Sequence, residues 1–168
     1  MKSLVLVSMF LSSLTCMAKD YVTISKSILI NEKIEDVYIH VSNTLNDDTW
    51  RTEVNDMQAD GAFEVGTTFT EDAHIGLRKN FITKTVLMEL IENKKAFYQT
   101  PLDAKYFLSS LREVEVVSES KTRFTYTVVF DRAMSRETLG ANLPSGLLEF
   151  SYGLIMKGYL RNLAELFD

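Results

Sequence analysis

Apolar and polar residues alternate along much of this chain, and in two places the apolar residues recur every three to four positions instead. Alternation is typical of strands with one buried face. It predicts a first strand over 21–30 and mostly strands and turns from about 54 to 131, with strands over 65–70, 81–91, 96–100, 106–117 and 122–131. Short turns separate these strands, so neighbouring strands are expected to be antiparallel.

The helical spacing occurs just after the first strand and again at the end of the chain. The first helix follows Asn31, its expected N-cap, and its apolar positions are Ile34, Val37, Tyr38, Val41 and Leu45. The second helix spans 147–168, with Ser145 as its expected N-cap. At 1.5 Å per residue it is roughly 30 Å long, enough to cross a whole sheet. Its apolar stripe is Leu148, Tyr152, Ile155, Tyr159, Leu163 and Leu166.

This order of elements predicts an α+β fold. About seven antiparallel strands form a sheet that must curl, and the long C-terminal helix covers its concave side. Small helices follow the first strand. We expect a single domain over 19–168, because no linker or internal repeat divides the chain. The connection 131–146 is long for such a domain, which favours either a lid or portal, or a plain solvated connection with one helical turn.

The N-terminus has the pattern of a secretory signal peptide. Lys2 precedes the apolar run 4–14, and small residues at Cys16 and Ala18 suit cleavage after Ala18. Residues 1–18 are therefore predicted to direct secretion or export to the periplasm. The alternatives are an uncleaved anchor, a buried first strand, or, less favoured by the residues before it, a lipoprotein acylated at Cys16.

Composition removes several function classes. Cys16 is the single cysteine, so the predicted mature chain excludes disulfides and thiolate chemistry. The net charge of −5 and the lack of a basic stripe disfavour nucleic-acid binding. The sequence has no zinc, calcium or phosphate-loop motif and no serine nucleophile elbow. We therefore expect no metal, no cofactor and, after signal cleavage, no stable membrane span. The oligomeric state has no signal in the sequence.

Several short motifs resemble the SRPBCC or START-like superfamily, and within it the polyketide cyclase/dehydrase-like branch. The match covers essentially all of 20–168, and it rests on order and spacing rather than on one specific motif. The sequence departs from the family at Asn31-Glu32, where a proline is frequent, and at Lys121-Thr122, where Gly-Thr is frequent. The matching residues are Val22, Ser25, Ile28 and Ile30, then Glu35-Asp36-Val37-Tyr38, Trp50, Val54, Val65-Gly66-Thr67 and Tyr159 to Leu166.

The resemblance implies a helix-grip fold with a deep cavity between the sheet and the long helix. Such cavities take lipids, sterols, polyketides or other apolar molecules, and the superfamily includes both carriers and enzymes, so fold alone does not decide function. The residues expected to line the cavity of this chain are Trp50, Phe69, Arg112, Tyr126, Phe150 and Tyr152.

Arg112 is the most informative of these candidates. It shares a strand face with apolar residues at both ends, which predicts an inward arginine that needs a partner. That partner is a ligand carboxylate or phosphate, or Glu71; the alternative is a bulge that turns Arg112 outward. His74 is expected in a surface turn, with an acid–base role at the cavity mouth as the alternative.

Three functions follow from these expectations. The first is an exported binding protein for a hydrophobic small molecule, with 131–146 as its gate. The second is a cyclase or dehydratase in which Arg112 and a tyrosine or His74 act on an apolar substrate. The third is a partner-binding protein with a filled interior. An inward Arg112 with a titratable neighbour favours the enzyme, and a wholly apolar cavity favours the carrier.

Overall fold

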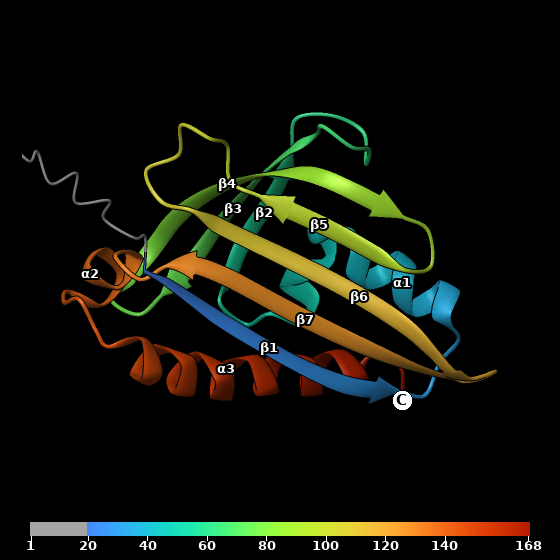
Figure 1. The fold of residues 1–168 in the computed structure, drawn as a ribbon. Coiled ribbons are helices and arrows are strands. Elements are labelled where there is room, and N and C mark those ends of the chain that lie inside the picture. The colour runs from blue at the N-terminus through green and yellow to red at the C-terminus, as the bar shows by residue number, and fades with distance from the viewer. Residues whose placement is uncertain (1–19) are drawn as a thin grey trace, which may run out of the picture.

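The computed structural model describes residues 20–168, which form a strongly curved antiparallel sheet with one long helix along its open side (Figure 1). The predicted signal segment 1–18, including Cys16, lies outside the described residues. The sheet order is β1-β7-β6-β5-β4-β3-β2, which confirms the predicted α+β helix-grip class. The strands are β1 (Tyr21–Ile30), β2 (Val54–Ala59), β3 (Thr68–Ile75), β4 (Arg78–Ile91), β5 (Lys95–Gln99), β6 (Leu108–Ser118) and β7 (Lys121–Asp131).

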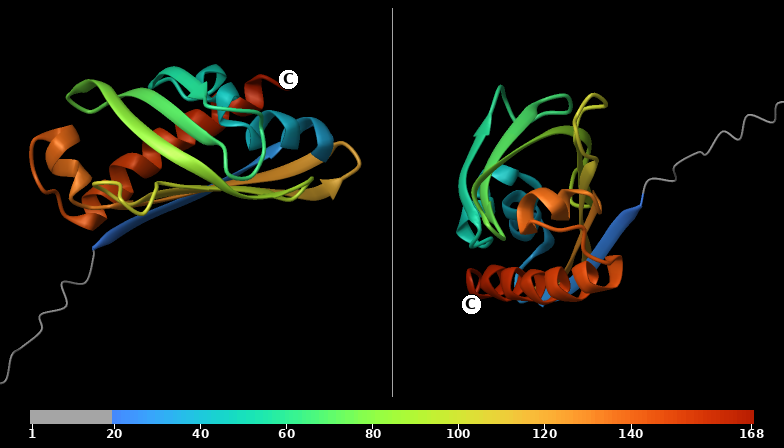
Figure 2. Two further views of the ribbon diagram at one scale, coloured as in Figure 1. Left: turned by 90° about the horizontal axis from the view of Figure 1, so that it is seen from above. Right: turned by 90° about the vertical axis from the view of Figure 1, so that its left-hand side faces the viewer.

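The helices close the sheet along its length and at its two ends. Helix α3 (Ser145–Glu165) runs beneath the sheet beside β1. Helix α1 (Ile34–Ser42) and the 3₁₀ helix η1 (Thr44–Thr49) lie toward one end, and the short helix α2 (Met134–Leu139) lies across the other (Figure 2). The connection 131–146 thus contains α2, which places side chains at one end of the enclosed space.

Local chemistry accounts for several shifted boundaries. Helix α1 begins after Lys33, and no side chain caps it, so the expected cap at Asn31 is wrong. The following helix η1 does have a side-chain cap, because the side-chain oxygen of Asn43 accepts a hydrogen bond from the Leu45 amide (3.0 Å). Strand β3 begins at Thr68 rather than at residue 65, because the turn before it includes Gly66 with φ of +99°.

The buried stripe of α3 is rotated from the predicted one. Ile155 and Leu166 are about half exposed, whereas Met156 and Leu160 are buried. Gly153 lacks a side chain and allows close approach to β1, where a Cβ would lie 3.3 Å from Cε of Lys26. Within residues 20–168, no helix is long and apolar enough to cross a membrane.

Candidate functional site

A cavity lies between the sheet and α3, with α2 at one end. Its volume is about 90 Å³, less than the roughly 150 Å³ of an engineered cavity that holds benzene and the roughly 300–1,000 Å³ of usual ligand pockets. The interior is therefore not solid, but it is small. The lining comes from every strand except β1, and from Thr44, Arg51, Glu53, α2 and α3.

The wall of the cavity changes from apolar to polar along the paired strands β6 and β7. Side chains two residues apart face the same side of a strand. The cross-strand pairs along this face are Leu108 with Phe130, Ser110 with Val128, and Arg112 with Tyr126. The apolar end lies toward α2, which adds Met134 and Leu139, and α3 adds Leu148 there and Tyr159 toward the other end. A bound molecule would therefore meet an apolar end and a polar end.

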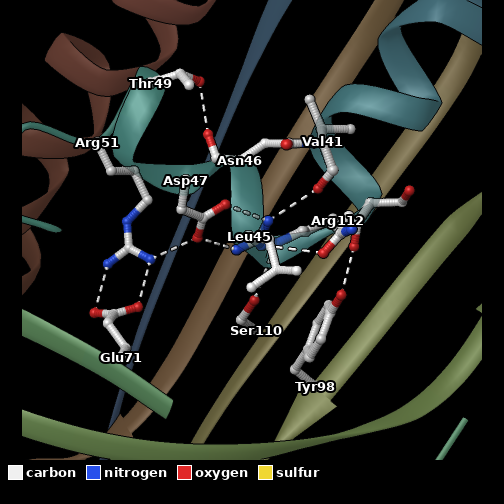
Figure 3. Close-up of polar contacts among 12 residues, drawn as sticks. Val41, Leu45, Asn46, Asp47, Thr49, Arg51, Glu71, Tyr98, Ser110 and Arg112 are labelled. Atoms are coloured by element: carbon white, nitrogen blue, oxygen red, sulfur yellow. Dashed lines mark hydrogen bonds and ion pairs between the residues drawn. The ribbon is translucent and has the colours of Figure 1, made fainter. Parts of the chain in front are cut away.

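The polar end is built on an ion pair between Arg112 and Asp47 (Figure 3). Two guanidinium nitrogens of Arg112 donate to the two carboxylate oxygens of Asp47, each at 2.6 Å, and one also donates to the carbonyl of Val41 (2.9 Å). Both side chains are almost fully buried, with exposed fractions of 1% and 0%. Burial lowers the pKa of Arg112, but the Asp47 carboxylate outweighs burial and raises it, so the guanidinium stays charged.

Arg51 extends this pair into a network. Its Nη1 donates to Asp47 (2.9 Å) and to Glu71 (2.8 Å), its Nη2 donates to Glu71 (3.0 Å) and Glu53 (2.9 Å), and its Nε donates to Glu53 (3.0 Å). Burial lowers the pKa of Arg51, but the surrounding carboxylates, Glu71 first, outweigh burial and raise it well above its usual value. Asp47 thus joins both arginines, and the polar end is one connected charge cluster.

Aromatic rings enclose the Arg112 guanidinium. Its central carbon lies 5.4 Å from the ring centres of Tyr98 and Tyr126 and 5.8 Å from that of Trp50. Asp47 binds the edge of the planar guanidinium, and the aromatic rings lie near the rest of its surface in cation–π contact. The Tyr98 hydroxyl in turn donates to the carbonyl of Ser42 (2.5 Å), which ties β5 to the end of α1.

Burial raises the pKa of five tyrosines, and this predicts a coupled alkaline transition. The pKa of Tyr98 rises to about 12, and burial raises those of Tyr38, Tyr126, Tyr152 and Tyr159 as well. These phenols ionise near pH 10 in the unfolded chain but only at higher pH in the folded chain. The difference stabilises the fold fully below pH 10, and this stabilisation is lost as the pH rises. We expect the free energy of unfolding to fall between about pH 10 and 12. Tyrosinate absorbance should rise over the same pH range in which the circular dichroism of the fold is lost. Ionisation of all five phenols in a still-folded protein would contradict this.

The structure places three of the six predicted cavity residues on the wall: Arg112, Tyr126 and Tyr152. Arg112 points inward as predicted, but its partner is Asp47, whereas Glu71 pairs with Arg51. The outward alternative for Arg112 is excluded by its 2% exposure.

The other three predicted residues do not line the cavity. Trp50 is buried behind Tyr126, with ring centres 5.6 Å apart. Phe69 packs behind Tyr98 in a separate apolar cluster, with ring centres 5.5 Å apart. Phe150 is 67% exposed on the outer face of α3, because Leu148 and Tyr152 occupy the inward face. Their assignment to the cavity wall is therefore corrected.

Sequence reasoning missed Asp47, Arg51, Glu53 and Tyr159. Asp47 lies in the polar segment 43–49, whose composition is typical of a turn, and no periodicity marks η1 as a buried element. Tyr159 belongs to the predicted inward stripe of the last helix, and nothing in the sequence distinguishes it from the other members of that stripe. One signal for Asp47 is present in the sequence. An inward Arg112 needs a carboxylate partner, and the segment after α1 supplies two candidates, Asp47 and Asp48.

The histidines lie outside the cavity. His74 is exposed on β3, within the strand rather than in the turn that follows, so the cavity-mouth alternative is not supported. His40 contacts Thr49 through Nε2 (3.0 Å) and packs edge-on against Phe167. Among residues 20–168, no group of three potential ligands is arranged to hold a metal ion.

An open groove of about 360 Å³ adjoins the apolar end of the cavity. It lies where β4 continues beyond its pairing with β5. That pairing ends at Val86 and Gln99, so the part of β4 before Val86 faces the loop 100–107 instead. Thr83, Leu108 and Met134 belong to the walls of both spaces. Lys105 and Glu137 form an exposed ion pair (2.8 Å) between the loop and α2. The groove and the cavity are thus separated by side chains that line both spaces.

Comparison with known proteins adds fold evidence. No protein-family model matches this chain, and no curated protein matches it. Solved structures do match. A START superfamily protein from Mycobacterium smegmatis aligns with a TM-score of 0.70 at 12% identity, over 87% of this chain and 97% of that chain. The Zhui aromatase/cyclase from Streptomyces sp. R1128 aligns at 0.69 with 10% identity, over 87% and 93%.

A third match is a hypothetical protein from Helicobacter pylori, with a TM-score of 0.66 at 8% identity over 100% of this chain and 99% of that chain. At these identities the similarity establishes the fold and not the activity. The neighbours support the START-like helix-grip architecture predicted from the sequence.

Proposed function

We propose that residues 20–168 bind a hydrophobic small molecule in the cavity between the sheet and α3. The observation that carries this proposal is the graded wall of β6 and β7, apolar at Leu108 and Phe130 and polar at Arg112 and Tyr126, around space that side chains leave unfilled. A small number of polar groups in an apolar pocket is typical of ligand sites. The START-like and aromatase/cyclase neighbours have the same fold.

The volume favours a narrow ligand, such as an alkyl chain, over a sterol or a fused polyketide. About 90 Å³ is too small for a fused-ring molecule, so such a ligand requires the cavity and the groove to join. Met134 stands between them, and a methionine side chain adapts its shape easily. The ligand therefore enters past Met134, and α2 acts as the gate expected of 131–146.

The direct test is to purify the protein from its native compartment and identify any molecule that accompanies it by native mass spectrometry. Recovery of a stoichiometric apolar compound supports the proposal. An empty protein that also takes up none of a panel of lipids, alkyl compounds and polyaromatic compounds would refute it.

Variants at Met134 test the route of entry. Met134→Trp is expected to slow uptake of 1-hexanol at least about tenfold, because the larger ring fills the passage between cavity and groove. Met134→Ala is expected to speed uptake. Exchange between free and bound 1-hexanol, followed by NMR, measures both rates. Met88→Trp, at an exposed position of β4 outside the cavity wall, is the matched control; equal rates in all three variants would reject the gate.

The second candidate is an enzyme of the cyclase or dehydratase type. The specific observation in its favour is that the phenols of Tyr126, Tyr152 and Tyr159 and the carboxylate of Glu53 lie on the cavity wall, where they would donate or accept protons. Arg112 has Tyr98 and Tyr126 beside it, but Asp47 already occupies its donors. Turnover would appear as loss of water from a bound apolar carbonyl compound, measured by mass.

We also propose that residues 1–18 are removed on export, which leaves a domain that begins at Lys19. Mass spectrometry of the chain recovered from the periplasm or medium tests this, since the expected N-terminal residue is Lys19. Intact chain retained in the cytoplasm would contradict it.

A further inference from the structure

The polar end of the cavity has a buried carboxylate oxygen without a hydrogen-bond partner, whereas the N–H groups of its two arginines are nearly all in use. We propose that it receives a hydrogen-bond donor, a hydroxyl or an ammonium group at the end of an apolar ligand, and that it rejects carboxylates and phosphates. This inference rests on the proposed function, since it concerns which molecule the same cavity takes. It replaces the expectation that Arg112 binds an anionic ligand.

The arginines are the obvious sites for an anion, but nine of their ten N–H groups already donate hydrogen bonds. A guanidinium has five N–H groups. Arg51 makes five hydrogen bonds, which are directed at Asp47, Glu53 and Glu71. Arg112 makes two bonds to Asp47, one to the carbonyl of Val41 and a longer one of 3.5 Å to Ser110. Arg112 thus keeps one N–H, on the same Nη2 that donates to Asp47, so an anionic ligand that reached it would lie beside the Asp47 carboxylate. At Arg51 an anionic ligand would have to displace a carboxylate.

The acceptors are less well occupied. The Oε1 atom of Glu53 accepts two bonds from Arg51, but its Oε2 atom is buried and has no hydrogen-bond partner. The hydroxyl oxygen of Thr44 is also buried and unpartnered. Both residues line the cavity. A buried carboxylate oxygen without a donor is costly, and a ligand hydroxyl or ammonium group would supply that donor.

The charges favour the same ligands. The cluster holds three carboxylates, from Asp47, Glu53 and Glu71, against the two guanidinium groups of Arg51 and Arg112. One negative charge is therefore in excess where little water is present to screen it. A carboxylate or phosphate brought to this end would be repelled and would also lose its hydration. An ammonium group would be attracted, and a hydroxyl would bring no charge.

The remaining polar groups accommodate such a head group. Tyr152 and Tyr159 lie on α3 facing the cavity. Burial, and next the neighbouring Glu53 carboxylate, raise the pKa of both phenols, so both stay neutral. A neutral phenol both donates and accepts, which suits a hydroxyl ligand. The apolar part of the ligand then points along the wall toward Leu148 and Phe130.

Four six-carbon probes of nearly equal shape test this inference on the purified protein: 1-hexanol, hexylamine, 1-fluorohexane and hexanoate. We expect 1-hexanol and hexylamine to bind at least about tenfold more tightly than 1-fluorohexane, which lacks a donor, and hexanoate to bind most weakly. Calorimetry gives Kd at neutral pH, and amide chemical-shift changes on β6 and β7 locate the bound molecule.

A Glu53→Gln variant tests the acceptor directly. It removes the excess charge and places an amide at the free position, so the affinity for hexylamine should fall at least about tenfold and that for hexanoate should rise. Glu89→Gln is the matched control, because Glu89 is also ion-paired, to Lys95 (2.8 Å), but lies outside the cavity wall. If Glu53→Gln fails to fold, Thr44→Val is the substitute test variant, and it is expected to bind 1-hexanol more weakly than the wild type.

The outcomes separate this inference from the proposed function. If no probe binds, the proposed function fails and the inference fails with it. If 1-fluorohexane binds as tightly as 1-hexanol, or hexanoate binds most tightly, the cavity still takes apolar molecules but the inference is overturned. Unchanged affinities for hexylamine and hexanoate in folded Glu53→Gln also overturn it. The wild-type order decides the question even if every variant unfolds.

Discussion

An Asp47→Asn variant is expected to lose at least about 3 kcal/mol of unfolding free energy, the range found when one partner of a buried ion pair is removed. Asparagine keeps the shape but removes the charge that offsets Arg112, which is almost fully buried beneath three aromatic rings. Arg51 retains Glu53 and Glu71, so the loss arises mainly at Arg112. Urea denaturation followed by circular dichroism measures it.

Asp48→Asn is the matched control for this prediction. It makes the same chemical change one residue further along the chain, at an exposed position, and should change stability by less than about 0.5 kcal/mol. Equal effects of the two substitutions would show that Asp47 is not the charge that holds Arg112.

Adding Arg112→Met to Asp47→Asn should restore much of the lost stability. A buried pair replaced by apolar groups of similar volume is often no less stable, whereas an unpaired buried charge is costly. The double-mutant cycle then gives a large interaction energy between the two positions. Additive losses in the double variant would contradict a direct pairing.

This cluster marks the limit of what the sequence predicts. Alternation along 106–117 predicts correctly that Arg112 faces inward, because a strand with one buried face has a period of two. The choice of partner is a tertiary property. Glu71 is on the correct face of its strand, but β3 and β6 are separated in the sheet by β4 and β5. Asp47 reaches Arg112 because η1 folds under the sheet, and no sequence pattern in 43–49 predicts that placement.

The cavity wall shows the same division between pattern and packing. Tyr126 and Tyr152 were predicted to face inward, and both do. Phe150 lies in a helical segment that is apolar on nearly all sides, which favours a buried position, yet helical geometry places it opposite Leu148 and Tyr152. Trp50 and Phe69 are buried as expected of large aromatic residues, but burial alone does not distinguish the wall of a cavity from the layer behind it.

The second large effect is expected at Gly76, in the turn between β3 and β4. Its φ is +59°, and a Cβ there would lie 2.6 Å from the carbonyl oxygen of Thr138 and would also collide with the side chain of Leu139. The same turn is hydrogen-bonded to α2. The Leu77 amide donates to the carbonyl of Thr138 (2.7 Å), and Nε of Arg78 donates to the carbonyl of Glu137 (3.0 Å). Gly76→Ala must therefore push α2 away from the sheet.

Gly140→Ala separates this collision from backbone strain alone. Gly140 also has a positive φ, +79°, but the nearest atom to a Cβ there is 3.8 Å away, so this variant should lose only about 1–2 kcal/mol, the cost of the left-handed conformation. Gly76→Ala should lose clearly more. It should also weaken binding of a cavity probe such as 1-hexanol, because Met134, Thr138 and Leu139 of α2 form the apolar end of the cavity. Thermal denaturation and calorimetry measure the two effects. If both variants lose the same stability and bind the probe equally, contact with this turn does not hold α2 in place.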